Sequence, residues 1–232
     1  MHSGHWCEVH LELPRHYIAA LHGTSTPDSL RKLSFSNLDV NDPDNIFLKF
    51  KMNINPSPMT FKISGFYLTN IEMSWDNLMH LTMEYISFDG VLKVIQDAPL
   101  LETCSLKVIA PSDGGIPMTR GAIVHHPQIR ALVLDSLVTE VFMELLNLLE
   151  LPSLESCELT SSSTNGGALP VDPVISFIKR SACGLKTFRL IYDAMRFSED
   201  VQGPGVEDCT RLVRVIPHLQ LWLGGYGVSC YQ

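Results

Sequence analysis

Histidine and cysteine are the residue types of this chain that most readily do chemistry, because both bind metal ions. Four of them stand within the first ten positions: His2, His5, Cys7 and His10. In an extended strand, however, Cys7 and His10 point to opposite faces and cannot close on one ion. The adjacent residues His125 and His126 are separated in the same way. We therefore predict no metal site and no cofactor.

Two of the six cysteines, Cys104 and Cys157, are candidate nucleophiles. Each occupies a position that Leu81 or Leu132 holds in a similar segment, which indicates a small buried side chain. A thiol in apolar surroundings has a raised pKa and is unreactive. The motifs G-x-S-x-G, H-E-x-x-H and G-x-x-x-x-G-K are absent from the sequence. We expect no catalytic residue and no enzymatic activity; the alternative is an enzyme whose site is assembled from loops.

The composition is typical of a folded protein, since 45% of the 232 residues are apolar and 18% are charged. A formal net charge of −8 argues against nucleic acid and against an anionic membrane as partners. The longest apolar stretch, 129–154, contains five charged residues and does not fit a membrane-spanning helix. The first residues lack the pattern of a secretory signal, and the cysteines are irregularly spaced, which favours reduced thiols. We expect a cytoplasmic or nuclear location.

A repeat is the strongest pattern in the sequence. Each copy is six residues long, with apolar residues at positions one, four and six. Six copies share this frame: Leu30–Phe35, Leu78–Met83, Leu101–Leu106, Ile129–Leu134, Leu154–Leu159 and Leu185–Leu190. Weaker copies are expected near Thr60–Ile63 and from Leu219, where Trp222 would hold position four. Such spacing in units of 20–29 residues is typical of leucine-rich repeats, and alternate apolar residues predict a short strand with one buried face.

Between these strands the apolar spacing changes to three and four, which predicts helices. Helices are expected to begin near Asp89, Thr139, Asp172 and Glu207, and Gly184 is expected to end the third. Strands that alternate with helices favour a parallel sheet.

The predicted fold is therefore an α/β leucine-rich-repeat solenoid, with parallel strands on the concave side and helices on the convex side. The repeats are irregular, at about 23–34 residues. We expect a single arc over residues 1–232, with repeats over about 6–223 and an irregular tail at 224–232. The alternative is a generic α/β domain with leucine-rich strands.

The sequence resembles the leucine-rich-repeat region of fungal F-box proteins, particularly the large basidiomycete set. The likeness covers about residues 6–223 and lies in short segments that follow one another in order: Trp6–Pro14, Trp75–Met83, Ala98–Leu106, Leu151–Glu155 and Phe177–Ser181. The resemblance implies a region that recognises the substrate of a ubiquitin ligase.

The F-box itself is expected to be absent. Leu13 and Pro14 match the beginning of an F-box, but the Cys–Trp pair that should follow is missing. Binding to a cullin-ligase adaptor is therefore expected only if an F-box exists outside this chain. A truncated or degenerate repeat protein without a ligase role is the alternative.

Positions three, five and seven of each copy face away from the core, onto the concave wall. Solenoids bind partners on such surfaces. We expect a non-enzymatic scaffold that binds a protein partner, whose identity the sequence does not give. The candidate protein-binding residues are His80, Glu84, Lys107, Asp135, Glu158 and Arg189.

The two ends of the predicted arc lack capping units. Apolar residues are expected to be exposed in the first and last strands: Trp6, Val9, Leu11, Leu13, Leu219, Leu221, Trp222 and Leu223. Because uncapped repeats expose apolar surface, we expect the chain to self-associate through these ends.

Overall fold

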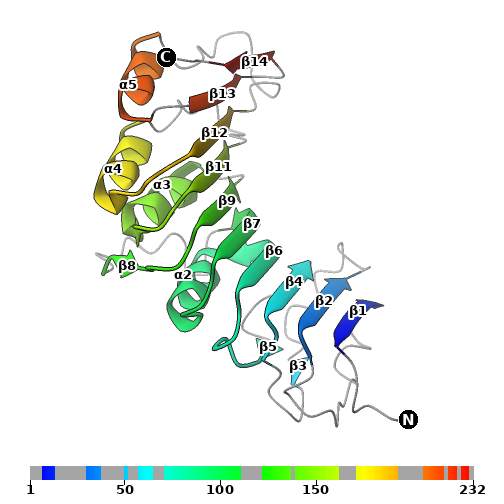
Figure 1. Ribbon diagram of the computed structural model, residues 1–232. Coiled ribbons are helices and arrows are strands. Elements are labelled where there is room, and N and C mark those ends of the chain that lie inside the picture. The colour runs from blue at the N-terminus through cyan, green and yellow to red at the C-terminus, as the bar shows by residue number, and fades with distance from the viewer. Residues whose placement is uncertain are drawn as a thin grey trace.

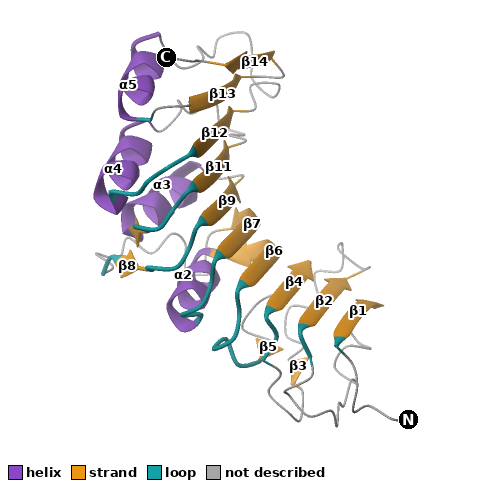
Figure 2. Cartoon of the chain, in the orientation of Figure 1, coloured by secondary structure: helices purple, strands orange, loops and turns teal. Residues whose placement is uncertain are grey.

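A sheet that follows an arc, with helices on its outer side, dominates the computed structural model (Figure 1). The described helices lie on the convex side, and no described helix covers the opposite face of the sheet (Figure 2). The structure describes residues 7–13, 30–37, 50–51, 57–64, 71–110, 122–136, 139–161, 171–192, 206–216, 219–223 and 226–229.

The main sheet has ten strands in the order β1-β2-β4-β6-β7-β9-β11-β12-β13-β14. Every neighbouring pair is parallel except the last, β13 and β14. Strands adjacent in this sheet are consecutive repeats in the sequence, so the predicted α/β solenoid of the leucine-rich-repeat type is confirmed. The strands are β1 Glu8–Leu13, β2 Lys32–Asn37, β4 Thr60–Ser64, β6 His80–Ser87, β7 Thr103–Ala110, β9 Ala131–Ser136, β11 Ser156–Ser161, β12 Thr187–Tyr192, β13 Leu219–Leu223 and β14 Tyr226–Ser229.

The described helices belong to the later repeats: α2 Phe88–Asp97, α3 Thr139–Leu148, α4 Val171–Ser181 and α5 Val206–Val215. Among the described residues before β6 there is no helix. Two short parallel pairs complete the structure, β3 (Phe50–Lys51) with β5 (Ile71–Glu72) and β8 (Val124–His125) with β10 (Leu149–Glu150). The predicted alternation of strand and helix therefore holds where α2, α3, α4 and α5 connect strands of the main sheet, whereas the described residues between β7 and β9 form only the short strand β8.

The core is built from two rows of apolar side chains that run from strand to strand. The strand register aligns position four of the repeats, and every member is at most 2% exposed: Leu33, Phe61, Leu81, Cys104, Leu132, Cys157 and Phe188. Position six forms the second row, with the same limit on exposure: Phe35, Ile63, Met83, Leu106, Leu134, Leu159 and Leu190. The repeat frame, including the weak copy near residue 60, is thereby confirmed.

A ladder of backbone hydrogen bonds holds the units together where the strands begin. The carbonyl of Arg130 accepts from the N–H groups of Glu155 and Ser156, at 2.8 and 2.9 Å. The carbonyl of Glu155 accepts in the same way from Lys186 and Thr187, at 2.7 and 3.1 Å. This paired bond recurs at each strand entrance from β1 to β12. Because the bond joins position two of one unit to positions two and three of the next, it fixes the register of the sheet from β1 to β12.

The helical layer has its own link, formed by Arg180 near the end of α4. Its Nε donates to the carbonyl of Leu149 at 3.0 Å, and its Nη2 donates to the same oxygen at 2.7 Å and to the carbonyl of Leu146. Leu146 lies in the last turn of α3, where carbonyls lack an intrahelical partner, and Leu149 directly follows the helix as the first residue of β10. In addition, the Leu151 N–H donates to Ser181 Oγ at 3.1 Å. The end of α4 therefore caps the end of α3.

The predicted frame of the last repeat is wrong by three residues. In the register, Leu219 pairs with Phe188, so Leu219 and not Trp222 holds position four. Position one is then Ile216, which is only 1% exposed. The error arose from Pro217, which resembles the prolines that precede position one in other copies, whereas here it follows position one.

Two further expectations at element ends differ from the structure. The tail at 224–232 is not irregular throughout, because Tyr226–Ser229 forms β14 against β13. Helix α4 ends before Gly184: Ala182 already has a positive φ of 48°, and its N–H donates to the carbonyl of Ile178 at 3.1 Å. A left-handed residue of this kind ends a helix even when it is not glycine.

The expected apolar ends lie largely outside the described residues. At the first strand, Val9 and Leu11 are half-buried against the core. At the other end, β14 pairs with the edge of β13, so the last parallel strand is not the edge of the sheet. Trp6 and the side chains of Leu13, Leu219, Leu221, Trp222 and Leu223 are not described. Within the described residues, no helix is long and apolar enough to cross a membrane.

Cys157→Asp should unfold the repeat array. Cys157 is 1% exposed and lies in the position-four row, so the variant buries a carboxylate without a partner. We expect a loss of about 4 kcal/mol or more in the free energy of unfolding, measured by urea titration with circular dichroism. The control is Ser156→Asp, on the exposed face of the same strand, which should change stability by less than about 0.5 kcal/mol. Equal stability of the two variants would refute the frame.

Arg180→Met should weaken the link between α3 and α4. The variant keeps much of the side-chain volume but leaves two carbonyls without a charged donor, at an expected cost of about 1.5–3 kcal/mol in unfolding free energy. Lys179→Met, at the exposed neighbouring position, is the control and should cost little. Thermal and urea unfolding of both variants measure the difference. A loss no greater for Arg180→Met than for Lys179→Met would contradict this role.

Candidate functional site: the concave face

The concave face consists of three rows of outward side chains, which the strand register aligns. The entrance row is Glu8, Lys32, Thr60, His80, Thr103, Ala131, Ser156 and Thr187. The middle row is His10, Ser34, Lys62, Thr82, Ser105, Val133, Glu158 and Arg189. The exit row is Glu12, Ser36, Ser64, Glu84, Lys107, Asp135, Thr160 and Ile191.

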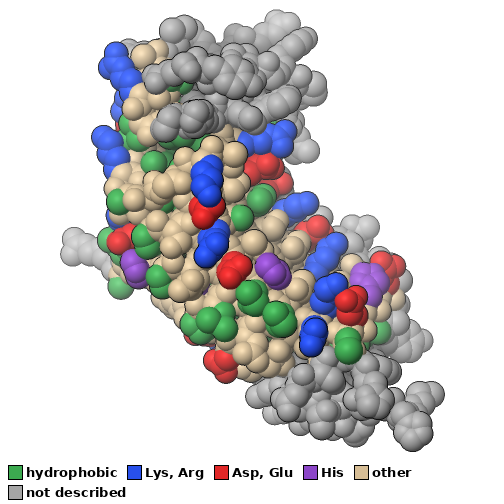
Figure 3. All heavy atoms as spheres, in the orientation of Figure 1, with side chains coloured by type: hydrophobic (Ala, Val, Ile, Leu, Met, Phe, Trp, Pro, Cys, Tyr) green, Lys and Arg blue, Asp and Glu red, His purple; other side chains and the backbone are tan. Residues whose placement is uncertain are grey.

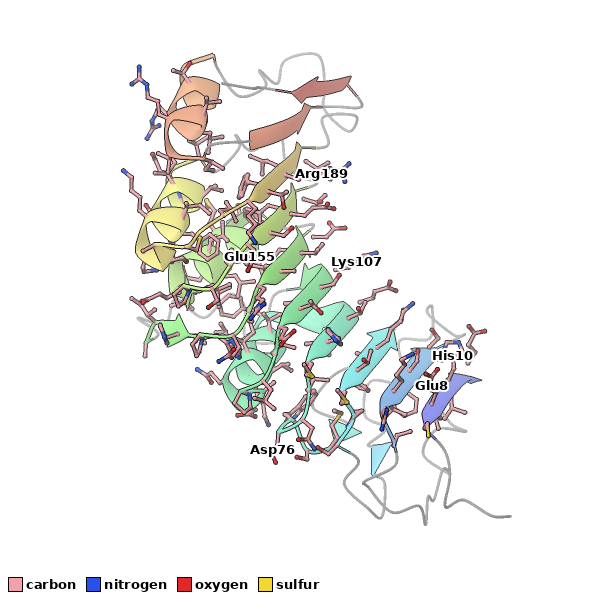
Figure 4. All side chains as sticks on the ribbon, in the orientation of Figure 1. Glu8, His10, Asp76, Lys107, Glu155 and Arg189 are labelled. Carbon is pink, nitrogen blue, oxygen red and sulfur yellow. The ribbon has the colours of Figure 1, made fainter. Side chains whose placement is uncertain are left out.

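The six residues predicted to bind a partner all lie on this face. His80 belongs to the entrance row, Glu158 and Arg189 to the middle row, and the other three to the exit row. Lys107 and Arg189 point away from the helices in Figure 4. The structure thus brings the predicted residues onto one surface, and whether they bind a partner stays a prediction.

Charges of opposite sign are neighbours along the exit row. Glu84, Lys107 and Asp135 are consecutive in the register of β6, β7 and β9. The Glu84 carboxylate accepts a hydrogen bond from Ser64 Oγ at 2.6 Å, so it is oriented by the preceding strand. Lys107 therefore stands between two carboxylates, one of them held in place.

Asp135 is an acidic residue of this face whose titration is altered. Its side chain is half-buried, and this burial raises the pKa of the carboxyl above its ordinary 3.8. The nearby ammonium of Lys107 lowers the pKa, and the carboxylate of Glu158 raises it, but burial has the largest effect. An ionised Asp135 is thus less well solvated than it would be in the unfolded chain.

Glu158 and Arg189 form an ion pair across β11 and β12. Arg189 Nη1 donates to Glu158 Oε2 at 3.2 Å, and the side chains of Arg189 and Glu158 are 41% and 34% exposed. A pair this exposed contributes about 1 kcal/mol or less to stability. Its charges therefore remain accessible to a partner at little cost to the fold.

Small and hydroxyl-bearing side chains separate these charges. The middle of the face has Thr82, Ser105 and Val133 side by side in the register. In the entrance row, His80 Nδ1 and Thr103 Oγ1 are 2.9 Å apart, and a similar bond of 2.9 Å joins Thr187 Oγ1 to Ser156 Oγ. Short side chains let a partner approach the strands closely, and the hydroxyl groups both donate and accept hydrogen bonds.

The six candidate residues do not include the charged residues of the first strands. Lys62 is exposed on β4, Lys32 Nζ forms an ion pair with Glu8 Oε1 at 2.7 Å, and His10 Nε2 lies 3.1 Å from Glu12 Oε1. The weak repeat copy near residue 60 and the strand expected after Trp6 contained the sequence pattern from which these outward residues could have been identified. Because both strands join the same sheet in register, the concave face extends to β1.

Metal ligands do not gather in the part of the chain that the structure describes: no group of three His, Cys, Asp or Glu side chains there could hold an ion. Cys7 and His10 are both exposed, while His2 and His5 lie outside the described residues.

The adjacent histidines diverge as predicted. His125 is exposed, with Nδ1 3.2 Å from Glu150 Oε1. His126 is 3% exposed, and its Nε2 donates to the carbonyl of Ala98 at 2.9 Å. Burial lowers the pKa of His126, which favours the neutral ring.

The two candidate nucleophiles are core residues, as predicted. Cys104 and Cys157 are 2% and 1% exposed. Burial raises the pKa of Cys104 to about 12 and that of Cys157 further still. Both thiols are therefore protonated at neutral pH and inaccessible, which makes them unsuitable as nucleophiles.

Fold and surface together define the class of this protein: an α/β solenoid of the leucine-rich-repeat type with an open concave sheet. No protein-family model, curated protein or solved structure matches the chain.

Asp135→Asn should stabilise the protein at neutral pH. A raised folded-state pKa means that the contribution of Asp135 to stability is complete below pH 3.8 and is lost as the pH rises through the raised pKa. The amide does not ionise, so the advantage of the variant in urea unfolding should shrink as the pH falls through the raised pKa and should be gone below pH 3.8.

Glu155→Gln is the control, for which the expected change in stability at neutral pH has the opposite sign. A hydrogen bond and the charge of Lys186 lower the pKa of Glu155 below its ordinary 4.5. The carboxylate therefore stabilises the fold above that pH, and the contribution is lost as the pH falls through the lowered pKa. This variant should be less stable than the parent at neutral pH, and the difference should vanish in acid. If both variants changed the free energy of unfolding at neutral pH in the same direction, the assigned directions of the two pKa shifts would be wrong.

Proposed function

We propose that the protein is a non-enzymatic scaffold that binds a protein partner on its concave face. The observation that carries this proposal is the continuous outward surface of β1 to β12, which the described helices leave open because they lie on the other side of the sheet (Figure 2). Extended concave sheets are the surfaces with which solenoids bind their partners.

The chemistry of the face indicates what kind of partner fits. Its charged side chains are nearly balanced, although the whole chain carries a net charge of −8. They are Glu8, Glu12, Lys32, Lys62, Glu84, Lys107, Asp135, Glu158 and Arg189. A partner with a polar segment of mixed charge complements this pattern, and Arg189 is of a residue type that is often found at the energetic centre of an interface.

The resemblance to fungal F-box proteins gives this scaffold a cellular role. On that basis the partner is a substrate that is delivered to a ubiquitin ligase, in the cytoplasm or nucleus. A cullin-ligase adaptor would then bind an F-box outside these residues, and not the concave face.

Two charge-swap variants test the proposal. The concave swap combines Glu158→Arg with Arg189→Glu, which inverts the ion pair on the concave face. The rim swap combines Glu155→Lys with Lys186→Glu, which inverts a pair of 2.5 Å at the edge of the sheet. Both pairs join β11 to the segment of β12, so each variant changes the same number of charges in the same repeats and keeps the net charge.

The measurement is quantitative mass spectrometry of proteins captured from an extract of the source organism by the parent and both variants. We expect the concave swap to lose at least about ten-fold in capture of specific partners, and the rim swap to retain them. Circular dichroism confirms that both variants are folded. Capture of the same proteins at the same level by the concave swap would contradict the proposal. If the parent captures nothing beyond the blank matrix, the degenerate-repeat alternative is favoured.

A further inference from the structure

A second surface of the solenoid differs from the concave face: the edge at which the strands begin. Position two of each repeat lies there, and its backbone N–H or carbonyl belongs to the backbone ladder. We call these residues the rim row: Cys7, Arg31, Met59, Met79, Glu102, Arg130, Glu155 and Lys186. Most of them are charged, as suits a solvent-exposed edge, but two consecutive members are methionines.

These methionines lie beside a hollow of about 310 Å³ in the rim. Met59 is 42% exposed and Leu100, which also lines the hollow, is 48% exposed, which makes them two of the three large apolar residues that are prominently exposed in the described part of the chain. The segments that enter β2, β4, β6 and β7 line the hollow with Leu30, Arg31, Ser57, Met59, Asn77, Met79 and Leu100. In Figure 3, hydrophobic side chains gather on the lower part of the visible face, beside a band of basic and acidic ones.

The comparison with sister repeats shows that the apolar walls are not required by the fold. Position two tolerates Glu102, Arg130 and Glu155 in the later units, with the same backbone bonds. Exposed methionine and leucine side chains at this edge are therefore an excess of apolar surface that the core does not use. Two prominently exposed apolar side chains that line one hollow make it a candidate binding site.

The polar groups of the hollow indicate the charge of its ligand. Arg31 is the charged residue among the lining side chains, and it is exposed. Ser57 Oγ also lines the hollow and is buried without a hydrogen-bond partner. A buried hydroxyl of this kind is unusual, since such groups are normally paired. A ligand with an apolar group and an adjacent carboxylate would complement both the methionine walls and the guanidinium.

We propose that this hollow, the rim pocket, binds a peptide segment of a partner protein in which an apolar side chain is followed or preceded closely by an acidic residue. The apolar side chain lies between Met59, Met79 and Leu100, and the carboxylate pairs with Arg31. A volume of about 310 Å³ suits one or two side chains, at the small end of the range for ligand sites. Methionine walls adapt to different apolar shapes, so the apolar residue varies while the acidic residue is selected by charge. The rim pocket is separate from the concave face and does not depend on the function proposed for that face.

Selection from a library of random linear peptides displayed on phage tests this inference. The target is the full chain, as the parent protein and as three variants. Arg31→Glu inverts the charge at the pocket, Met59→Glu places a carboxylate in its wall, and Arg130→Glu inverts a charge in the same rim row away from the pocket. Circular dichroism and urea unfolding show whether each variant keeps the fold.

The parent should enrich peptides that combine an apolar residue with a neighbouring Asp or Glu. Fluorescence anisotropy with a selected peptide should show about ten-fold weaker binding for Arg31→Glu and loss of binding for Met59→Glu, with no change for Arg130→Glu. Selection on Arg31→Glu should instead enrich Lys or Arg beside the apolar residue. The proposal is overturned if the parent enriches no peptide, if Arg31→Glu keeps the acidic preference, or if Met59→Glu binds as the parent does.

Discussion

The paired hydrogen bond at each strand entrance is the constraint on which the rest of the molecule depends. One carbonyl per repeat accepts from two consecutive N–H groups of the next repeat, and the bond recurs from Cys7 to Thr187. It fixes the register, and a strand shifted by one residue would turn its whole buried set outward. The two core rows, the three outward rows and the rim row are all consequences of that single alignment.

The strand frame could be predicted from sequence because it rests on local alternation. Positions four and six point to one face, and at Cys104 and Cys157 a small apolar residue is as informative as leucine. The same alternation is enough to assign His80, Glu84 and Lys107 to the outward face. Where alternation was weak the prediction failed, as at Leu219, where Pro217 suggested a frame that the pairing with Phe188 does not allow.

Other features depend on contacts between repeats and leave no signal in a single repeat. The capping of α3 by Arg180 joins residues 31 positions apart, and the left-handed Ala182 ends α4 where a later glycine looked more suitable. The rim pocket draws on four successive repeats. Its methionines stand out as unusual only when the strand register aligns them with the charged residues at position two of the other repeats.

Alternation along each strand also separates the residues that hold the fold from those that meet solvent. Inward positions are at most 2% exposed from β2 to β12, whereas their immediate neighbours face outward. Substitutions on the outward positions can therefore accumulate without loss of the core, so recognition can diverge much faster than architecture. Gain or loss of a whole repeat changes the face in steps of about 4.8 Å, the spacing of neighbouring strands. The solenoid is in this sense an evolvable surface, whose outward chemistry can vary independently of its core.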